Sequence, residues 1–62
     1  MTFRAQAADA GKRLDRFLQE QLPGHSRSQL QGWIRASRVR VNGKPEKPSY
    51  ALRGMDSVEV EP

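Results

Sequence analysis

The chain has no cysteine and only one histidine among its 62 residues. Without cysteine, the protein has no disulfide bonds, no thiolate chemistry and no cysteine-ligated zinc. A single histidine also argues against a transition-metal site built from protein ligands alone. We therefore expect neither a metal site nor a cofactor.

Long hydrophobic runs are absent as well. No apolar stretch approaches the roughly 20 residues of a membrane span, and the N-terminus lacks the hydrophobic region of a signal peptide. We therefore expect no membrane contact and a cytoplasmic location. The length fits one small domain over residues 1–62, which we expect to be monomeric, and such a domain buries only about 60% of its unfolded surface. Its thin core leaves little room for an enclosed pocket of about 300–1,000 Å³, so no small-molecule ligand is expected.

Acidic residues are scarce in the middle of the chain. Residues 26–47 hold six basic residues and one acidic residue, a net charge of +5, against +1 for residues 1–25 and −2 for residues 48–62. The six basic residues are Arg27, Arg35, Arg38, Arg40, Lys44 and Lys47. A local basic excess on a folded unit indicates a partner that carries phosphates.

Two segments have the apolar spacing of amphipathic helices. In residues 13–22 the apolar side chains recur at i, i+3, i+4 and i+8, and Pro23-Gly24 ends the pattern. Ser26 precedes Gln29 by three residues, which predicts a capping box at the start of a second helix. That helix has Leu30, Trp33 and Ile34 on its buried stripe and ends near Ala36-Ser37.

After the second helix the period changes to two. Val39 and Val41 alternate with polar residues, which predicts a strand with valines inward, and Asn42-Gly43 predicts a tight hairpin turn. Residues 44–49 contain two prolines and are expected to form a loop or an edge strand.

Three further segments complete the predicted fold. Residues 2–7 alternate and predict a short strand, residues 8–11 a loop, and residues 57–61 a last strand. Residues 50–52 are expected to pair briefly. The predicted fold class is α+β, with two packed helices against a small, mostly antiparallel sheet.

Polar side chains on the second helix and the strand after it are the candidate binding residues. On a helical wheel Arg27, Gln31 and Arg35 recur every four residues. Arg38, Arg40 and Asn42 then follow on the outer face of the strand. We expect one continuous surface, because the planar guanidinium group binds phosphate with two hydrogen bonds and stacks on exposed bases. The alternative is a solvated face that only maintains solubility.

The remaining candidates favour structural roles. Trp33 and Tyr50 are possible stacking platforms for bases, but core packing is the preferred prediction for both. His25 has no second ligand or base nearby and is expected to make at most a minor phosphate contact. Asp15 lies in the first turn of a helix, where the dipole favours a carboxylate. No partner carboxylate, nucleophile or glycine-rich loop accompanies it, so we predict a structural Asp15 and no catalytic residue.

Four blocks of the chain closely resemble the S4-like RNA-binding domain. They are Arg13-Leu14-Asp15-x-Phe17-Leu18, Leu22-Pro23-Gly24-x-Ser26-Arg27-Ser28-Gln29-Leu30, Ile34-Arg35 and Arg38-Val39-Arg40-Val41-Asn42-Gly43-Lys44-Pro45. In that family RNA lies against the second helix and the following strand. The resemblance implies RNA contacts from a set that we call the basic surface: Arg27, Gln31, Arg35, Arg38, Arg40, Asn42 and Lys44.

Two segments are similar in sequence to the N-terminal domain of large-subunit ribosomal RNA pseudouridine synthases. They are the second block and Lys47-Pro48-Ser49-Tyr50. In those enzymes the catalytic aspartate belongs to a separate downstream domain, in an Arg-Leu-Asp motif with different neighbours from those of Asp15. The resemblance therefore implies a non-enzymatic targeting module, excised from a larger isomerase, that docks structured ribosomal RNA. Glycine is common in the family where Ser37 and Met55 stand, and glycine favours positive φ.

Three other functions remain open from the sequence. One is a stand-alone S4-like, ribosome-associated RNA-binding protein. Another is a helix-turn-helix DNA-binding domain with residues 27–35 in a major groove, although the basic residues continue onto the strand, which such a helix does not require. The third is an interaction domain for acidic protein partners.

Overall fold

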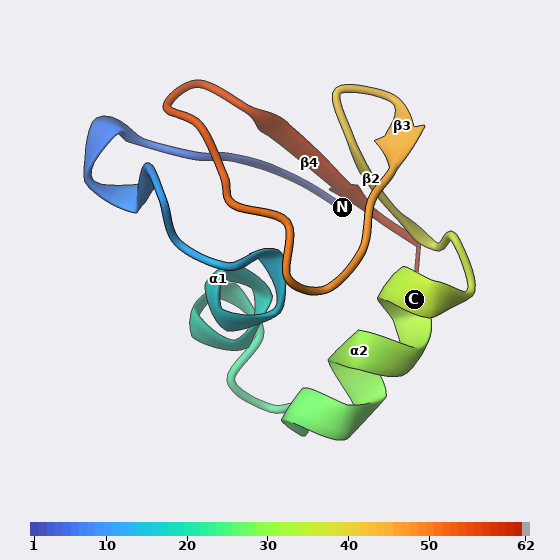
Figure 1. Ribbon diagram of the computed structural model, residues 1–62. Helices are drawn as coiled ribbons and strands as arrows, with labels where there is room; N and C mark the ends of the chain where they lie inside the picture. Colours follow the sequence, from blue (N-terminus) through green and yellow to red (C-terminus); the bar gives the residue numbers. More distant parts are fainter. Residues whose placement is uncertain (62) are drawn as a thin grey trace.

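The computed structural model describes residues 1–61 of the protein. Its elements are β1 (Thr2–Arg4), the 3₁₀ turn η1 (Ala7–Asp9), α1 (Leu14–Gln21), α2 (Arg27–Arg35), β2 (Val39–Val41), β3 (Lys44–Pro45) and β4 (Ser57–Val60). Figure 1 shows the two helices on one side of the sheet. The predicted α+β class is confirmed.

The four strands form one sheet in the order β1-β4-β2-β3, and every neighbouring pair is antiparallel. The last strand, β4, lies between the first strand and β2. Val58 on β4 therefore pairs with Phe3 on one side and Val41 on the other. This arrangement places the first strand at one edge of the sheet and the last strand in its interior.

The core lies between the sheet and the two helices. Its buried hydrophobic residues are Ala5, Leu14, Phe17, Leu18, Leu30, Ile34, Val39, Val41, Leu52, Val58 and Val60. The valines of β2 and β4 face inward at every second position, as the period-2 pattern predicts. Each fully buried large aliphatic or aromatic side chain contributes about 1.5–3 kcal/mol, so this small set supplies most of the driving force for folding.

Both ends of α2 are capped. The Ser26 Oγ accepts a hydrogen bond from the Gln29 backbone N–H at 3.1 Å, which confirms half of the predicted capping box. The other half is wrong, because the Gln29 Oε1 lies 3.0 Å from His25 Nδ1 instead of returning to the cap. At the C-terminal end, the N–H groups of Ser37 and Arg38 donate to the carbonyls of Ile34 and Trp33, which is a Schellman motif.

Among residues 1–61, three residues other than glycine have left-handed backbone angles. Ser37 has φ 60° in the Schellman motif, Asn42 has φ 53° in the hairpin turn, and Met55 has φ 74° before β4. Asn42 and Gly43 (φ 82°) form the two-residue hairpin turn that the sequence predicts, since Val41 pairs with Lys44 across it. Ser37 and Met55 are the two positions at which the family resemblance favours glycine, and the structure gives both the conformation that glycine favours.

The N-terminal segment differs from the prediction. The first strand ends at Arg4, whereas the sequence predicts that it continues to Ala7. Ala7 is exposed and begins η1, one residue before the predicted start of the loop. The cause is local, because the Asp9 carboxylate accepts from the Gln6 backbone N–H at 2.9 Å and turns the chain. Residues 50–52 form one isolated antiparallel β-bridge, in which the backbone of Ala51 pairs with that of Arg13.

Candidate nucleic-acid interface

Helix α2 and the chain beyond it carry most of the basic surface. Arg27 and Arg35 are exposed at the two ends of the helix, and Gln31 between them is half-buried. Arg38 is the last residue of the Schellman motif, and Lys44 begins the edge strand β3. Figure 1 shows the C-terminal end of α2 leading directly into β2, with β3 at the edge of the sheet.

Three cations of the basic surface are exposed without an ionic partner among residues 1–61. None of the ion pairs in this part of the chain involves Arg35, Arg38 or Lys44. Lys12, Arg13 and Arg16 do form ion pairs, and Lys12 lies 2.9 Å from an Asp9 oxygen, whereas Arg4 and Arg53 form none among residues 1–61. The charges of Arg35, Arg38 and Lys44 are therefore available to an external anion.

Arg40 lies on a different face. Because its neighbours Val39 and Val41 point into the core, Arg40 points away from the helices. It stands opposite Glu59 in the sheet register, and its Nη1 lies 3.7 Å from an oxygen of Glu61. The structure therefore does not bring Arg40 together with the cations of α2, and the expected continuity between helix and strand is interrupted by the sheet itself.

The buried carboxylate of Asp15 holds the first half of α2. Arg13 donates to both of its oxygens, at 3.1 and 3.0 Å. The Gln31 amide donates to Oδ2 at 2.9 Å, and Arg27 Nη2 does so at 3.4 Å. Burial opposes ionisation, but the hydrogen bonds from Gln31 and Arg13 outweigh it and lower the pKa of Asp15. This geometry gives Asp15 the structural role predicted for it and orients Arg27 and Gln31.

A second buried carboxylate, Asp56, holds the hairpin turn. It accepts hydrogen bonds at 2.9 Å from the Asn42 amide, the Tyr50 hydroxyl and the Arg53 backbone N–H. The carbonyl oxygen of the Asn42 side chain accepts from Ser57 N–H at 3.0 Å. Burial opposes ionisation of Asp56, yet the Arg53 and Asn42 hydrogen bonds lower its pKa, while the bond to Asp56 raises the pKa of Tyr50. Both polar ends of the Asn42 side chain therefore form hydrogen bonds within the protein, although the residue itself is exposed.

The hydrogen-bond partners of Asp15 and Asp56 were not predicted from the sequence. A signal existed for Asp15, which lies three residues before Leu18 on the buried side of its helix and therefore needs polar partners. No comparable signal existed for Asp56, because its partner Asn42 lies 14 residues away and the contact depends on the tertiary fold.

The aromatic residues pack as predicted. Trp33 and Tyr50 are half-buried and lie against the core. The ring of His25 lies beside Trp33, with centroids 4.8 Å apart and planes tilted by 58°. His25, which precedes α2, thus packs against Trp33 of that helix.

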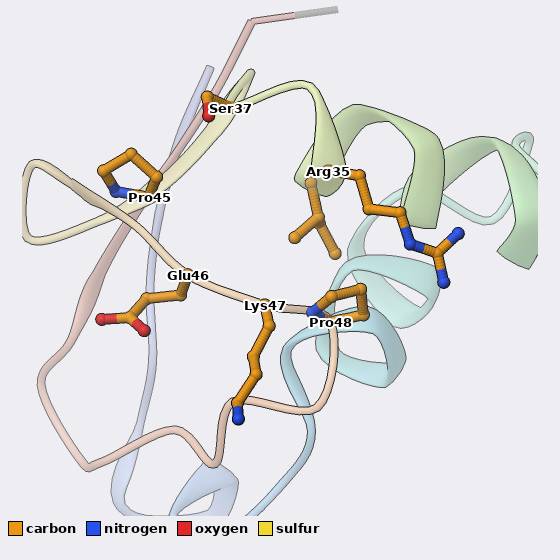
Figure 2. Close-up of a pocket in the computed structure, with 7 residues that line it drawn as sticks. Arg35, Ser37, Pro45, Glu46, Lys47 and Pro48 are labelled. Atoms are coloured by element: carbon orange, nitrogen blue, oxygen red, sulfur yellow. The ribbon is translucent and has the colours of Figure 1, made fainter.

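An open groove lies beside the C-terminal end of α2 (Figure 2). Its volume is about 500 Å³, and it is lined by Ile34, Arg35, Ser37, Pro45, Glu46, Lys47 and Pro48. From the length of the chain, we expected a core too thin to enclose a pocket. This groove is open to solvent. It adds Lys47, a cation of the central segment that was not assigned to the basic surface.

Residues 1–61 contain neither a cluster of metal-binding side chains nor a membrane-spanning helix. No group of three or more acidic or histidine side chains in this range is placed to hold a metal ion. No helix in the same range has the length and apolar character to cross a membrane.

Comparison with known proteins identifies relatives over nearly the whole chain. The S4 domain model matches residues 12–58. Ribosomal large subunit pseudouridine synthase C of Escherichia coli is 43% identical over 56 residues, which cover 90% of this chain and 18% of that protein. An uncharacterized RNA pseudouridine synthase of Chlorobaculum parvum is 33% identical over 60 residues, 97% of this chain and 18% of that protein. The corresponding synthase D of Neisseria meningitidis is 43% identical over 51 residues, 82% of this chain and 14% of that protein. The chain thus spans less than a fifth of the length of these relatives.

Proposed function

This chain belongs to the S4 domain family, and from that premise we propose that it is an RNA-binding module that docks structured ribosomal RNA. We further propose that it serves as the targeting domain of a large-subunit ribosomal RNA pseudouridine synthase. The names of its relatives support this assignment, as does the small share of their length that it covers. In this proposal the module positions RNA, and a separate catalytic domain isomerises uridine. A cytoplasmic location and a monomeric module belong to the same proposal.

The observation that carries the proposal is the group of exposed cations at and beyond the C-terminal end of α2. Arg35, Arg38 and Lys44 have no carboxylate partner among residues 1–61. Phosphates that bind them release counterions, so affinity falls with salt at a slope of about −0.7 to −0.9 per contact. Three contacts give a slope of about −2 to −3 in a plot of log affinity against log salt concentration.

The other members of the basic surface have distinct parts in the proposal. Arg27 is 55% exposed although it contacts Asp15, so its outer face is open to a phosphate. Gln31 and Asn42 act mainly through geometry, because Gln31 fixes α2 against Asp15 and Asn42 holds the hairpin that presents Lys44. Arg40 lies on the opposite face of the sheet, and its removal is expected to weaken binding less than removal of Arg35.

Alanine substitution tests this surface. Arg35→Ala and Arg38→Ala are each expected to weaken binding to a structured ribosomal RNA hairpin and to reduce the salt slope by about one unit. Arg16→Ala is the matched control, because its side chain is 71% exposed on α1 and its ion pair with Glu20 is 3.6 Å long. The control removes the same charge outside the proposed surface. Equal affinities for all three variants and the wild type would refute the proposed surface.

A further inference from the structure

We propose that the groove beside the C-terminal end of α2 binds one unpaired nucleotide of the RNA, an inference that rests on the proposed function. The groove volume of about 500 Å³ lies within the range of about 300–1,000 Å³ that is usual for ligand sites. Proteins recognise RNA mainly through unpaired bases that leave the helical stack and pack against side chains. A groove of this size matches a single nucleotide rather than a duplex.

The lining combines an apolar wall with two cations. Pro45 and Pro48 supply the apolar surface on which a base packs, and the buried Ile34 lies beneath them. Figure 2 shows Arg35 extending from the end of α2 and Lys47 from the chain after β3, with Pro48 between them in this view. Neither cation has an ionic partner among residues 1–61. A nucleotide whose base packs on the apolar wall and whose phosphate binds the two cations contacts both parts of the lining.

Two features at this place would oppose a phosphate, and the structure offsets both. The C-terminal end of a helix repels anions, but the Ile34 and Trp33 carbonyls already accept hydrogen bonds at 3.1 and 2.9 Å in the Schellman motif. Glu46 also lines the groove, and Figure 2 shows its carboxylate pointing to the opposite side from Arg35. The Arg35 side of the groove is therefore the place for the phosphate.

The groove is formed before RNA arrives. Pro45 and Pro48 each fix a backbone angle. The carbonyl of Pro48 accepts from Asp15 N–H at 3.2 Å, and that of Lys47 accepts from Tyr50 N–H at 3.0 Å. A preformed site loses little conformational entropy when it binds, which favours recognition by so few residues.

The test compares two RNA hairpins with the same loop and the same number of phosphates, made equal by a 5′-terminal phosphate on the fully paired hairpin. One stem is fully paired, and the other contains one bulged nucleotide. Affinities of the wild type, Lys47→Ala and Lys44→Ala are measured by fluorescence anisotropy at one salt concentration, after thermal unfolding has shown that each variant is folded. Lys44 is the matched control, because it is an exposed lysine on β3, three residues before Lys47, that does not line the groove.

The wild type is expected to bind the bulged hairpin at least about five-fold more tightly, the lower limit for one packed base. Lys47→Ala loses this preference, whereas Lys44→Ala weakens both complexes equally and retains it. In the wild-type complex the methyl resonances of Ile34 shift and those of the fully buried Leu18 do not. Equal wild-type affinities for the two hairpins, without a shift at Ile34, would overturn the groove proposal alone. Failure to bind either hairpin would overturn the proposed function as well.

Discussion

Substitution of Asp15 by asparagine tests the role of the buried carboxylate. The change keeps the shape of the side chain and removes its charge. An asparagine oxygen in the position of Oδ2 still faces Arg13, Arg27 and Gln31, but the new amide then faces the Nε–H of Arg13, so one hydrogen bond is lost. The remaining bonds lose their charge assistance.

The expected cost follows from the exposure of the partners. Hydrogen bonds to charged groups contribute about 1.5–3 kcal/mol each. Arg13 and Arg27 are 50% and 55% exposed and therefore regain solvation when they turn to water, which reduces the loss. We expect Asp15→Asn to lower the free energy of unfolding by about 2–3 kcal/mol. For a 62-residue domain the total is about 3–9 kcal/mol, so this loss is a large fraction of the stability of the domain.

Thermal unfolding, followed by circular dichroism between pH 3 and pH 7, is the assay. At about 4–8 °C per kcal/mol, the melting temperature at pH 7 falls by about 8–24 °C. Because the folded pKa of Asp15 is lowered, its stabilisation is present above the ordinary value of 3.8 and is lost as the pH falls through the folded pKa. The wild type therefore loses stability below about pH 4, and Asp15→Asn loses less over the same range.

Glu20→Gln is the matched control for Asp15→Asn. The Glu20 side chain is 44% exposed and pairs with Lys12 and Arg16 on the surface, so its removal is expected to cost at most about 1 kcal/mol. If Asp15→Asn melted within a few degrees of the wild type and had the same pH dependence, the proposed role of this carboxylate would be refuted.

Three further predictions concern stability and are measured by urea unfolding. Ser37→Gly and Met55→Gly are each expected to raise the free energy of unfolding by about 0.5–1 kcal/mol, because both residues have positive φ; a loss for both would contradict the strain argument. Gly32→Ala is expected to gain about 1 kcal/mol, since a Cβ at this exposed helical position meets no atom within 4 Å; an unchanged midpoint would count against it. Tyr50→Phe leaves Asp56 with one fewer donor and should cost about 1–2 kcal/mol; a neutral result would show that water replaces the hydroxyl.

Local chemistry explains why much of the fold was predictable from the sequence. The Ser26 cap and the Asn42-Gly43 turn depend on atoms within a few residues, and both are present as predicted. The alternation of Val39 and Val41 likewise gave the correct inner face. In each case the energetic preference lies in the segment itself, so the rest of the chain does not need to be known.

The candidate site was less predictable because it depends on how distant elements are placed. The same alternation that turns valines inward directs Arg40 away from α2, a consequence visible only once the helices are known to cover the inner face. Gln31 meets Asp15 across 16 residues, and Asn42 meets Asp56 across 14. The family resemblance implied RNA contacts for both amides, whereas the fold gives them partners within the protein. RNA contact by the basic surface stays a prediction.

The most direct test of the central claim is an amide-resolved NMR titration with a structured ribosomal RNA hairpin, run beside a DNA duplex of equal charge. We expect the largest amide chemical-shift changes in residues 27–47, centred on Arg35 and Arg38. These changes are expected to be stronger with RNA than with DNA. An equal response to both nucleic acids, or no shift near Arg35 and Arg38, would contradict the proposal that this face of the domain binds RNA.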